Sequence, residues 1–213
     1  MTLRLRKDPA LQNPQTTTLE LWRSAFGREY TDRNDQEKPE RVTSWRRLLD
    51  GVMPKRALEI GCNVGWNLEY LRRIGVEDLY GIEPQTYAVT RARARNPLFN
   101  VLHGTAFELP FRDRFFELAF TSGVLIHISP DQVGAALDEI YRVSSRYIVA
   151  IEYGTTHQSE QEVLYRGKQS ALWKRDHGAL WQRRYPDLSL VRTLELGVAD
   201  GYDDCTAHLF EKK

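Results

Sequence analysis

A glycine turn that directly follows an apolar strand is the clearest chemical signal in the sequence. Residues 57–67 read ALEIGCNVGWN, with Gly61 and Gly65 placed just after the apolar run that ends at Ile60. Glycine lets the chain turn sharply and lets a ligand approach the backbone closely. In a sheet of alternating strands and helices, such a turn lies beside the crevice in which nucleotides bind.

An acidic residue at the end of the next predicted strand is the second signal. Glu83 lies in the run GIEP at 81–84, one strand–helix unit after Glu59. A carboxylate in this place can accept hydrogen bonds from both hydroxyls of a ribose. Each signal alone is compatible with a plain turn or an exposed acid, but the two in register predict a nucleoside-binding site.

The spacing of apolar residues predicts the elements that position this site. Strands are expected at 56–60, 78–82, 99–103, 115–121 and 147–151, and helices at 18–26, 39–50, 66–74, after Pro84 and after Ser129. This alternation predicts an α/β, Rossmann-like fold with a doubly wound, mostly parallel sheet. Two further runs, 188–196 and 204–210, predict a C-terminal antiparallel strand pair.

The chain divides into two expected parts. Residues 1–52 are expected to form an N-terminal helical arm or lid, and 53–213 the main domain. Residues 154–186 interrupt the strand–helix alternation after a strand's carboxyl end. Long insertions at that position tend to be functional, so this segment is expected on the substrate side.

Composition limits the classes of partner. Lys plus Arg (30) nearly equals Asp plus Glu (29), so the sequence lacks the basic excess typical of nucleic-acid-binding proteins. Two cysteines indicate neither a disulfide framework nor a zinc site, and they suit a reducing compartment. No apolar run is long enough for a membrane span. We expect a cytoplasmic protein with a small-molecule partner and no metal; its oligomeric state stays open.

At these residues the sequence resembles the class I S-adenosylmethionine-dependent methyltransferases. Glu59, Gly61 and Gly65 match the family's first motif, although Asn63 stands where a glycine is commonest, and the resemblance covers about residues 55–152. It implies S-adenosylmethionine as cofactor and S-adenosylhomocysteine as product. The expected cofactor-binding residues are Tyr30, Glu59, Gly61, Asn63, Gly65, Glu83, Pro84, Thr105, Ala106 and Ser122.

A narrower resemblance concerns the acceptor. Residues 26–34, 165–167 and 172–176 look like segments of the methylases associated with pseudaminic acid biosynthesis. This resemblance implies methyl transfer to an oxygen or nitrogen atom of a small polar acceptor, such as a sugar or a surface-glycan precursor.

Two residues are candidates for catalysis. His127 follows the fourth predicted strand, and an imidazole can take a proton from an acceptor hydroxyl near neutral pH. The alternative is a histidine that hydrogen-bonds its loop or shapes the methionine end of the cofactor site. Glu152 closes the fifth strand at the same edge, where it either orients substrate or caps a neighbouring turn.

Four residues are expected to contact the acceptor, namely Arg33, Tyr153, Tyr165 and Arg166. Arg166 matches the geometry of a carboxylate or phosphate, so with Tyr165 it could grip an acidic acceptor. The alternative is an exposed loop with one anchoring aromatic ring. Arg33, together with Tyr30, either folds over the cofactor as a lid or ends a polar helix.

Two other functions compete with methyl transfer. An NAD-type oxidoreductase also uses a ribose-binding acid, but its fingerprint needs glycines where this sequence has Asn63 and Trp66. A non-catalytic scaffold that binds S-adenosylmethionine also remains possible, because the sequence carries no strongly marked base.

Overall fold

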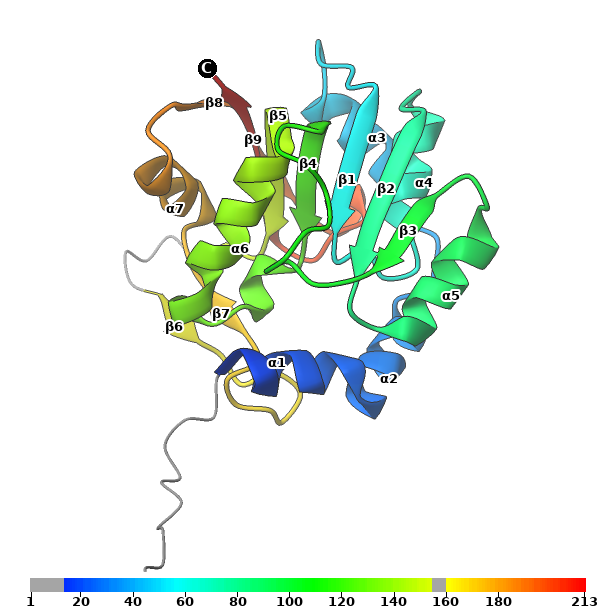
Figure 1. The fold of residues 1–213 in the computed structure, drawn as a ribbon, viewed down its shortest axis with the longest axis vertical. Helices are drawn as coiled ribbons and strands as arrows, with labels where there is room; N and C mark the ends of the chain where they lie inside the picture. The colour runs from blue at the N-terminus through cyan, green and yellow to red at the C-terminus, as the bar shows by residue number, and fades with distance from the viewer. Residues whose placement is uncertain (1–13, 155–159) are drawn as a thin grey trace, which may run out of the picture.

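A seven-stranded sheet forms the centre of the protein (Figure 1). The computed structural model describes residues 14–154 and 160–213. The strand order is β3-β2-β1-β4-β5-β9-β8; β1 to β5 are parallel, whereas β9 is antiparallel to both β5 and β8. The strands are β1 Arg56–Ile60, β2 Asp78–Glu83, β3 Asn100–His103, β4 Phe116–Ser122, β5 Ser144–Glu152, β8 Leu188–Leu196 and β9 Cys205–Lys212.

Helices cover both faces of this sheet and bury two apolar clusters. Helices α3, α4 and α5 contribute to one cluster, and α6 and α7 contribute to the other. The helices are α1 Pro14–Arg23, α2 Ala25–Arg33, α3 Glu40–Leu48, α4 Trp66–Arg73, α5 Thr86–Arg95, α6 Pro130–Val143 and α7 His177–Arg184. The predicted fold class, with its C-terminal antiparallel pair, is therefore confirmed.

Strand β1 shows why the parallel core reads as a nearly continuous apolar run. Ala57 belongs to the first cluster, whereas Leu58 and Ile60 belong to the second, so successive side chains alternate between the two faces. Ile60 pairs with Ile82 of β2 and with Thr121 of β4. The carboxyl ends of all three strands therefore meet at one edge of the sheet.

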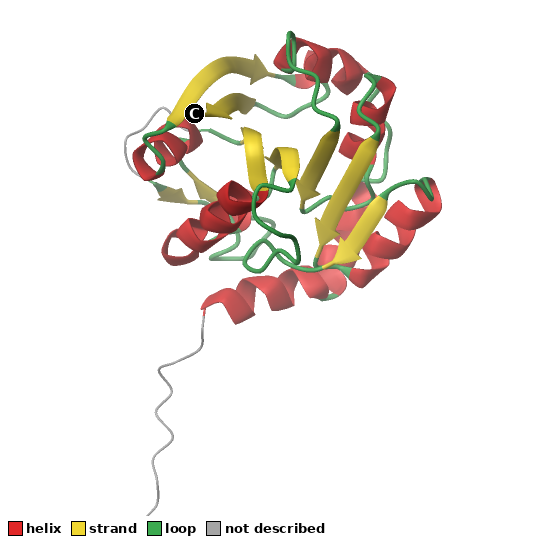
Figure 2. Ribbon diagram, turned by 45° about the horizontal axis from the view of Figure 1, so that its top comes forward, coloured by secondary structure: helices red, strands yellow, loops and turns green. Residues whose placement is uncertain are grey.

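The N-terminal helices lie across this carboxyl edge, with α1 and α2 next to the strand ends in both ribbon views (Figures 1 and 2). The single helix predicted over 18–26 is wrong, because the chain breaks at Ser24 and a second helix begins. The Ser24 side chain accepts a hydrogen bond from the backbone N–H of Phe26, which makes it the N-cap of α2.

Three other boundaries differ from the prediction. Helix α5 begins at Thr86 with Gln85 as its N-cap, so Pro84 lies in the preceding turn. Strand β5 is longer than predicted at both ends. The insertion contains α7 and a short hairpin, β6 Gln161–Glu162 and β7 Trp173–Lys174. None of the described helices combines the length and the apolar character needed to cross a membrane.

Candidate functional site

A cavity of about 680 Å³ opens at the carboxyl edge of the sheet, and most of the predicted site residues line it. It is walled by the ends of β1, β2 and β4, by α2, and by the hairpin of the insertion. The predicted residues that line it are Tyr30, Arg33, Glu59, Gly61, Asn63, Glu83, Pro84, Thr105, Ala106, Ser122, His127, Tyr153, Tyr165 and Arg166.

The glycine turn is fixed by backbone hydrogen bonds and by close packing. The N–H groups of Gly61 and Cys62 both donate to the carbonyl of Ile82, at 2.7 and 3.0 Å. Gly61 has φ +73°, and a Cβ there would lie 2.5 Å from a methyl group of Val124. Asn63 also has a positive φ, +46°, which asparagine tolerates better than most residues. A larger residue at 61 would therefore strain the turn and displace the loop after β4.

Glu83 is held rigidly while it keeps capacity for a ligand. Its Oε2 accepts from the N–H of Asn63 at 2.9 Å, and its Oε1 accepts from the N–H of Gln85 at 2.8 Å. A carboxylate oxygen can accept two hydrogen bonds, so one acceptor position remains on each oxygen. Two adjacent acceptors suit the two hydroxyls of a ribose. Burial raises the pKa of Glu83 to about 7, against the lowering effect of the two N–H groups.

A second buried acid leaves acceptors without protein donors. Glu59 Oε1 accepts from the side-chain amide of Asn67 at 2.7 Å, while Glu59 Oε2 and Asn67 Oδ1 have no partner among the described residues. Buried acceptors are normally satisfied, so these two call for a donor from a ligand. Burial raises the pKa of Glu59 to about 8. Glu59 Oε2 and Asn67 Oδ1 together suit the ammonium group of an amino acid.

Arg41 supplies the opposite charge in the same cavity. Its Nε donates to the carbonyl of Gly201 at 2.8 Å, and its guanidinium lies 4.0 Å from the ring centre of Tyr202. It forms no ion pair with any residue in the described ranges. The remaining guanidinium N–H groups suit the carboxylate of an amino acid. Neither Arg41 nor Asn67 was predicted to belong to the site.

A short loop after β3 forms another wall. Thr105 Oγ1 accepts from the N–H of Phe107 at 3.3 Å, and Ala106 is buried beside it. The Thr105 hydroxyl therefore shapes the loop that borders the cavity. Ser122, at the end of β4, also lines the cavity.

His127 lies at the other end of the cavity, among aromatic rings. Its Nδ1 lies 2.6 Å from the carbonyl oxygen of Ala171, so Nδ1 carries the proton and Nε2 keeps a lone pair. The rings of Trp22 and Tyr165 lie 4.5 and 5.2 Å from the imidazole, centre to centre. Burial lowers the pKa of His127 to about 4, so the ring is neutral near pH 7.

Glu152, predicted to be catalytic, does not line the cavity. Its two oxygens accept from the N–H groups of Val124, Leu125 and Ile126 at 3.2 to 3.4 Å. It therefore caps the turn that precedes His127, and burial raises its pKa to about 7. These contacts match turn capping, the second of the two roles that the sequence left open for Glu152; its catalytic role stays a prediction.

Gly65 also lies outside the cavity lining, contrary to the expectation that it leaves room for a ligand. A Cβ at Gly65 would face Phe99 and Ala92, at 3.5 and 3.6 Å. Its φ of +79° at the N-cap of α4 explains the glycine instead, because other residues rarely adopt that conformation.

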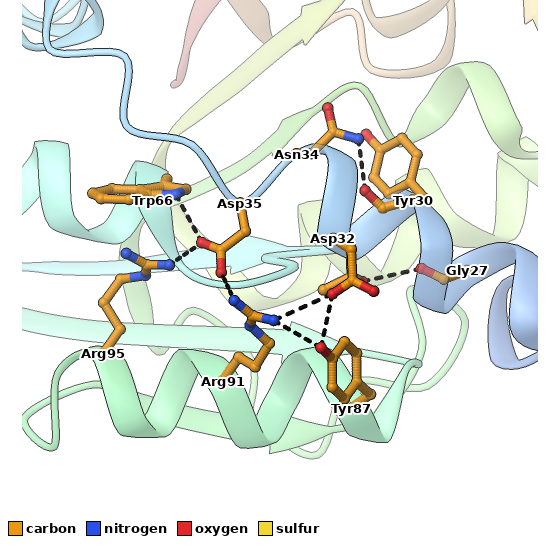
Figure 3. Close-up of polar contacts among 10 residues, drawn as sticks. Gly27, Tyr30, Asp32, Asn34, Asp35, Trp66, Tyr87, Arg91 and Arg95 are labelled. Atoms are coloured by element: carbon orange, nitrogen blue, oxygen red, sulfur yellow. Dashed lines mark hydrogen bonds and ion pairs between the residues drawn. The ribbon is translucent and has the colours of Figure 1, made fainter.

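Helix α2 is fastened over the cavity by an ionic cluster (Figure 3). The carboxylate of Asp35 pairs with Arg91 and Arg95 of α5 and accepts from the indole N–H of Trp66 at 3.2 Å. Asp32 accepts from the Tyr87 hydroxyl at 2.7 Å. Arg91 and Arg95 of α5 therefore hold the N-terminal segment. Among the described residues, no group of three or more histidines, cysteines and acids could hold a metal ion.

Comparisons of sequence match the central part of the chain. Residues 58–146 match a family model described as a methyltransferase domain. A tRNA U34 carboxymethyltransferase from Trichlorobacter lovleyi is 31% identical over 91 residues, which is 39% of this chain and 28% of that protein. Cycloartenol-C-24-methyltransferase 1 from Oryza sativa subsp. japonica is 26% identical over 125 residues, 55% of this chain and 36% of that protein. The chain thus spans well under half the length of these curated relatives.

Solved structures match nearly the whole chain. The 1,6-didemethyltoxoflavin-N1-methyltransferase of Burkholderia thailandensis, with S-adenosylhomocysteine bound, has a TM-score of 0.72 at 16% identity and covers 97% of this chain and 93% of its own. The magnesium protoporphyrin IX methyltransferase of Synechocystis, with S-adenosylmethionine bound, has a TM-score of 0.72 at 14% identity, with 97% and 100% covered. The chain has the fold of these methyltransferases, and its residues 58–146 are similar to a methyltransferase domain.

Proposed function

We propose that the protein is an S-adenosylmethionine-dependent methyltransferase that acts on an oxygen or nitrogen atom of a small polar acceptor. The observation that carries the proposal is Glu83, whose carboxylate is oriented by two backbone N–H groups and keeps one acceptor position on each oxygen. That arrangement suits the ribose of a nucleoside cofactor, and it lies beside the glycine turn of a matched methyltransferase domain.

The amino-acid end of the cofactor would lie between Glu59 and Arg41. The unpartnered oxygens of Glu59 and Asn67 accept from an ammonium group, and the free guanidinium N–H groups of Arg41 donate to a carboxylate. The cavity thus offers acceptors for each cationic group and donors for each anionic group of that moiety. Pro84, Thr105, Ala106 and Ser122 would border the nucleoside and sulfonium regions.

The chain's own contribution to chemistry is to position the acceptor and receive its proton. When bound, S-adenosylmethionine would supply an electrophilic methyl group for a lone pair of the acceptor, with S-adenosylhomocysteine as the leaving group. The neutral Nε2 of His127 can accept the proton that the acceptor loses. Alignment of acceptor and methyl group supplies much of the rate, and α2 with the hairpin would exclude water around them.

The identity of the acceptor belongs to the same proposal. A sugar or surface-glycan precursor follows from the resemblance to the pseudaminic acid methylases, with Arg33, Tyr153, Tyr165 and Arg166 as contacts. A tRNA acceptor, suggested by the name of one partial relative, receives no support from charge, because the sequence has a formal net charge of only +1. The N-terminal lid and a cytoplasmic location are also part of the proposal.

Two experiments separate the proposal from its two alternatives, an NAD-type oxidoreductase and a non-catalytic scaffold. Trp66, which stacks on Tyr70, occupies the position where a dinucleotide-binding turn needs glycine. Thermal shift of the protein with S-adenosylhomocysteine, S-adenosylmethionine and NAD should show stabilisation by the first two alone. Formation of S-adenosylhomocysteine from S-adenosylmethionine with candidate acceptors then distinguishes an enzyme from a scaffold. Stabilisation by NAD alone would contradict the proposal.

A further inference from the structure

The hairpin of the insertion presents one face to the acceptor end of the cavity. Gln161 pairs with Lys174 across the hairpin, and the N–H of Val163 donates to the carbonyl of Leu172 at 2.8 Å. Side chains alternate along paired strands, so Leu172 and Lys174 share a face while Trp173 turns away. Val163, Leu172 and Lys174 all line the cavity, whereas Trp173 is buried behind the hairpin.

Lys174 is a partly buried cation for which the described residues provide no partner. Its ammonium group forms no hydrogen bond and no ion pair with the residues that the structure describes. The adjacent Arg175, by contrast, pairs with Glu160 and donates to the carbonyls of Leu125 and Ile128, at 2.8 Å each. A cation in a cavity wall that lacks a counter-charge favours an anionic ligand.

Arg166 adds a second cation at the rim of the same wall. It is exposed, it has a φ of +49° in the tight turn of the hairpin, and its only described contact is with the ring of Tyr165, at 6.0 Å. It therefore remains available for a ligand. The two buried acids, Glu59 and Glu83, line the nucleoside end of the cavity and not this wall.

Rings surround the space between these cations and His127. Trp22 and Tyr165 both line the cavity, with ring centres 4.5 and 5.2 Å from that of His127. Together with the aliphatic side chains of Val163 and Leu172, they offer flat apolar surfaces that suit the faces of a ring compound.

We infer that Lys174, with Arg166 at the rim, binds the acidic group of the methyl acceptor. The acceptor would be a small ring compound that carries one carboxylate or phosphate and presents a hydroxyl or amine to His127. This inference rests on the proposed methyltransferase function. The ring is either aromatic or a sugar, since both pack on aromatic side chains.

The test uses the protein saturated with S-adenosylhomocysteine and two pairs of probes. The aromatic pair is 4-hydroxybenzoate and 4-hydroxybenzamide; the sugar pair is glucuronate and glucuronamide. Dissociation constants are measured by calorimetry or ligand-observed NMR for the wild type, Lys174→Gln and Lys168→Gln. Lys168 lies in the same hairpin turn, is exposed and does not line the cavity, so it serves as the matched control.

We expect the wild type and Lys168→Gln to bind at least one acid about tenfold more tightly than its amide. Lys174→Gln should lose that preference. The pair that responds identifies the ring as aromatic or as a sugar. Equal binding of acid and amide, binding of neither, or the same preference in Lys174→Gln would overturn the inference. Such a failure with normal S-adenosylhomocysteine binding counts against this subsite alone, whereas loss of S-adenosylhomocysteine binding in the wild type counts against the proposed function.

Discussion

Three buried carboxylates at the edge of the sheet differ in role because they differ in partners. Glu152 accepts three backbone N–H groups and caps a turn. Glu83 accepts two and keeps two acceptor positions for a ligand. Glu59 has one donor, from a side chain, and one oxygen without any. Hydrogen-bond donors stabilise the ionised form of a carboxylate. A carboxylate with few protein donors therefore depends on a ligand in the cavity to stabilise its charge.

Binding of S-adenosylhomocysteine should release protons near pH 7. The pKa of Glu59, about 8 in the free protein, leaves it mostly protonated, and an adjacent ammonium group would favour its charged form. Calorimetry in buffers of different ionisation enthalpy measures the release. Glu59→Gln should release close to one proton fewer than the wild type. An equal release in both proteins would show that the ammonium group does not lie beside Glu59.

His127 should stay neutral, with its proton on Nδ1, from about pH 5 to pH 8. The reasons are its burial, which lowers its pKa to about 4, and the carbonyl of Ala171, which accepts from Nδ1. Long-range nitrogen–proton NMR of the imidazole reports both the tautomer and the charge. An imidazolium at pH 6, or a proton on Nε2, would contradict the role of Nε2 as the acceptor of the substrate's proton.

Local spacing could predict Glu59, Glu83 and Gly61 but not Arg41. Glu59 and Glu83 end predicted strands, so the topology alone brings them to one edge. Arg41 comes to that edge only because its guanidinium meets Gly201, 160 residues away in sequence. No local pattern encodes such a contact.

At the scale of elements, α2 is held by its neighbours more than by its own sequence. The helix has nine residues and buries only Gly27 and Thr31. A helix this short is marginal in isolation. The pairing of Asp35 with Arg91 and Arg95, just beyond its carboxyl end, joins it to α5 (Figure 3).

Asp35→Asn should therefore loosen α2 without unfolding the sheet. We expect backbone amides of 25–33 to exchange with deuterium about tenfold faster, because local opening becomes easier by ~1.4 kcal/mol. Hydrogen-exchange mass spectrometry measures this, with Asp50→Asn, an exposed acid just after the carboxyl end of α3, as control. Unchanged exchange in α2 would mean that the ionic cluster does not hold the helix.

Helices and strands could be predicted from the sequence where a regular apolar pattern continues over many residues. Strand β1 and the region from β4 through α6 agree with their predictions to within a few residues, since each element buries a regular apolar pattern. The break at Ser24 was missed because the pattern of Leu19, Trp22 and Phe26 runs across it, while the capping signal is one hydroxyl. The hairpin of the insertion was missed because its strands have two residues each.

At the scale of the whole molecule, buried titratable groups should make stability fall as the pH rises from 6.5 to 8. Burial raises the pKa of Glu59, Glu83 and Glu152 to about 8, 7 and 7, so their contribution is full below about 4.5 and is lost as the pH rises through those values. Burial lowers the pKa of His127 and His177 to about 4 and 3, so their contribution grows as the pH rises to about 6.5. The two trends oppose each other below pH 6.5.

Above pH 6.5 the histidines no longer offset the carboxylates. Thermal unfolding of the ligand-free protein between pH 6.5 and 8 therefore measures the stability that is lost as the carboxylates ionise. The melting temperature should fall over this range, and Glu59→Gln should reduce the fall by about 2–4 °C, equivalent to ~1 kcal/mol. A melting temperature that rises from pH 6.5 to 8 would show that these carboxylates are already ionised in the folded protein.

Calorimetric titration with S-adenosylhomocysteine tests the central claim most directly, because it needs no acceptor. We predict that the wild type and Glu77→Ala, an exposed acid near the start of β2, bind it equally. Glu83→Ala should bind about 100-fold more weakly, since it loses two charge-assisted hydrogen bonds to the ribose. Absence of binding in the wild type, or equal affinity in Glu83→Ala, would contradict the account.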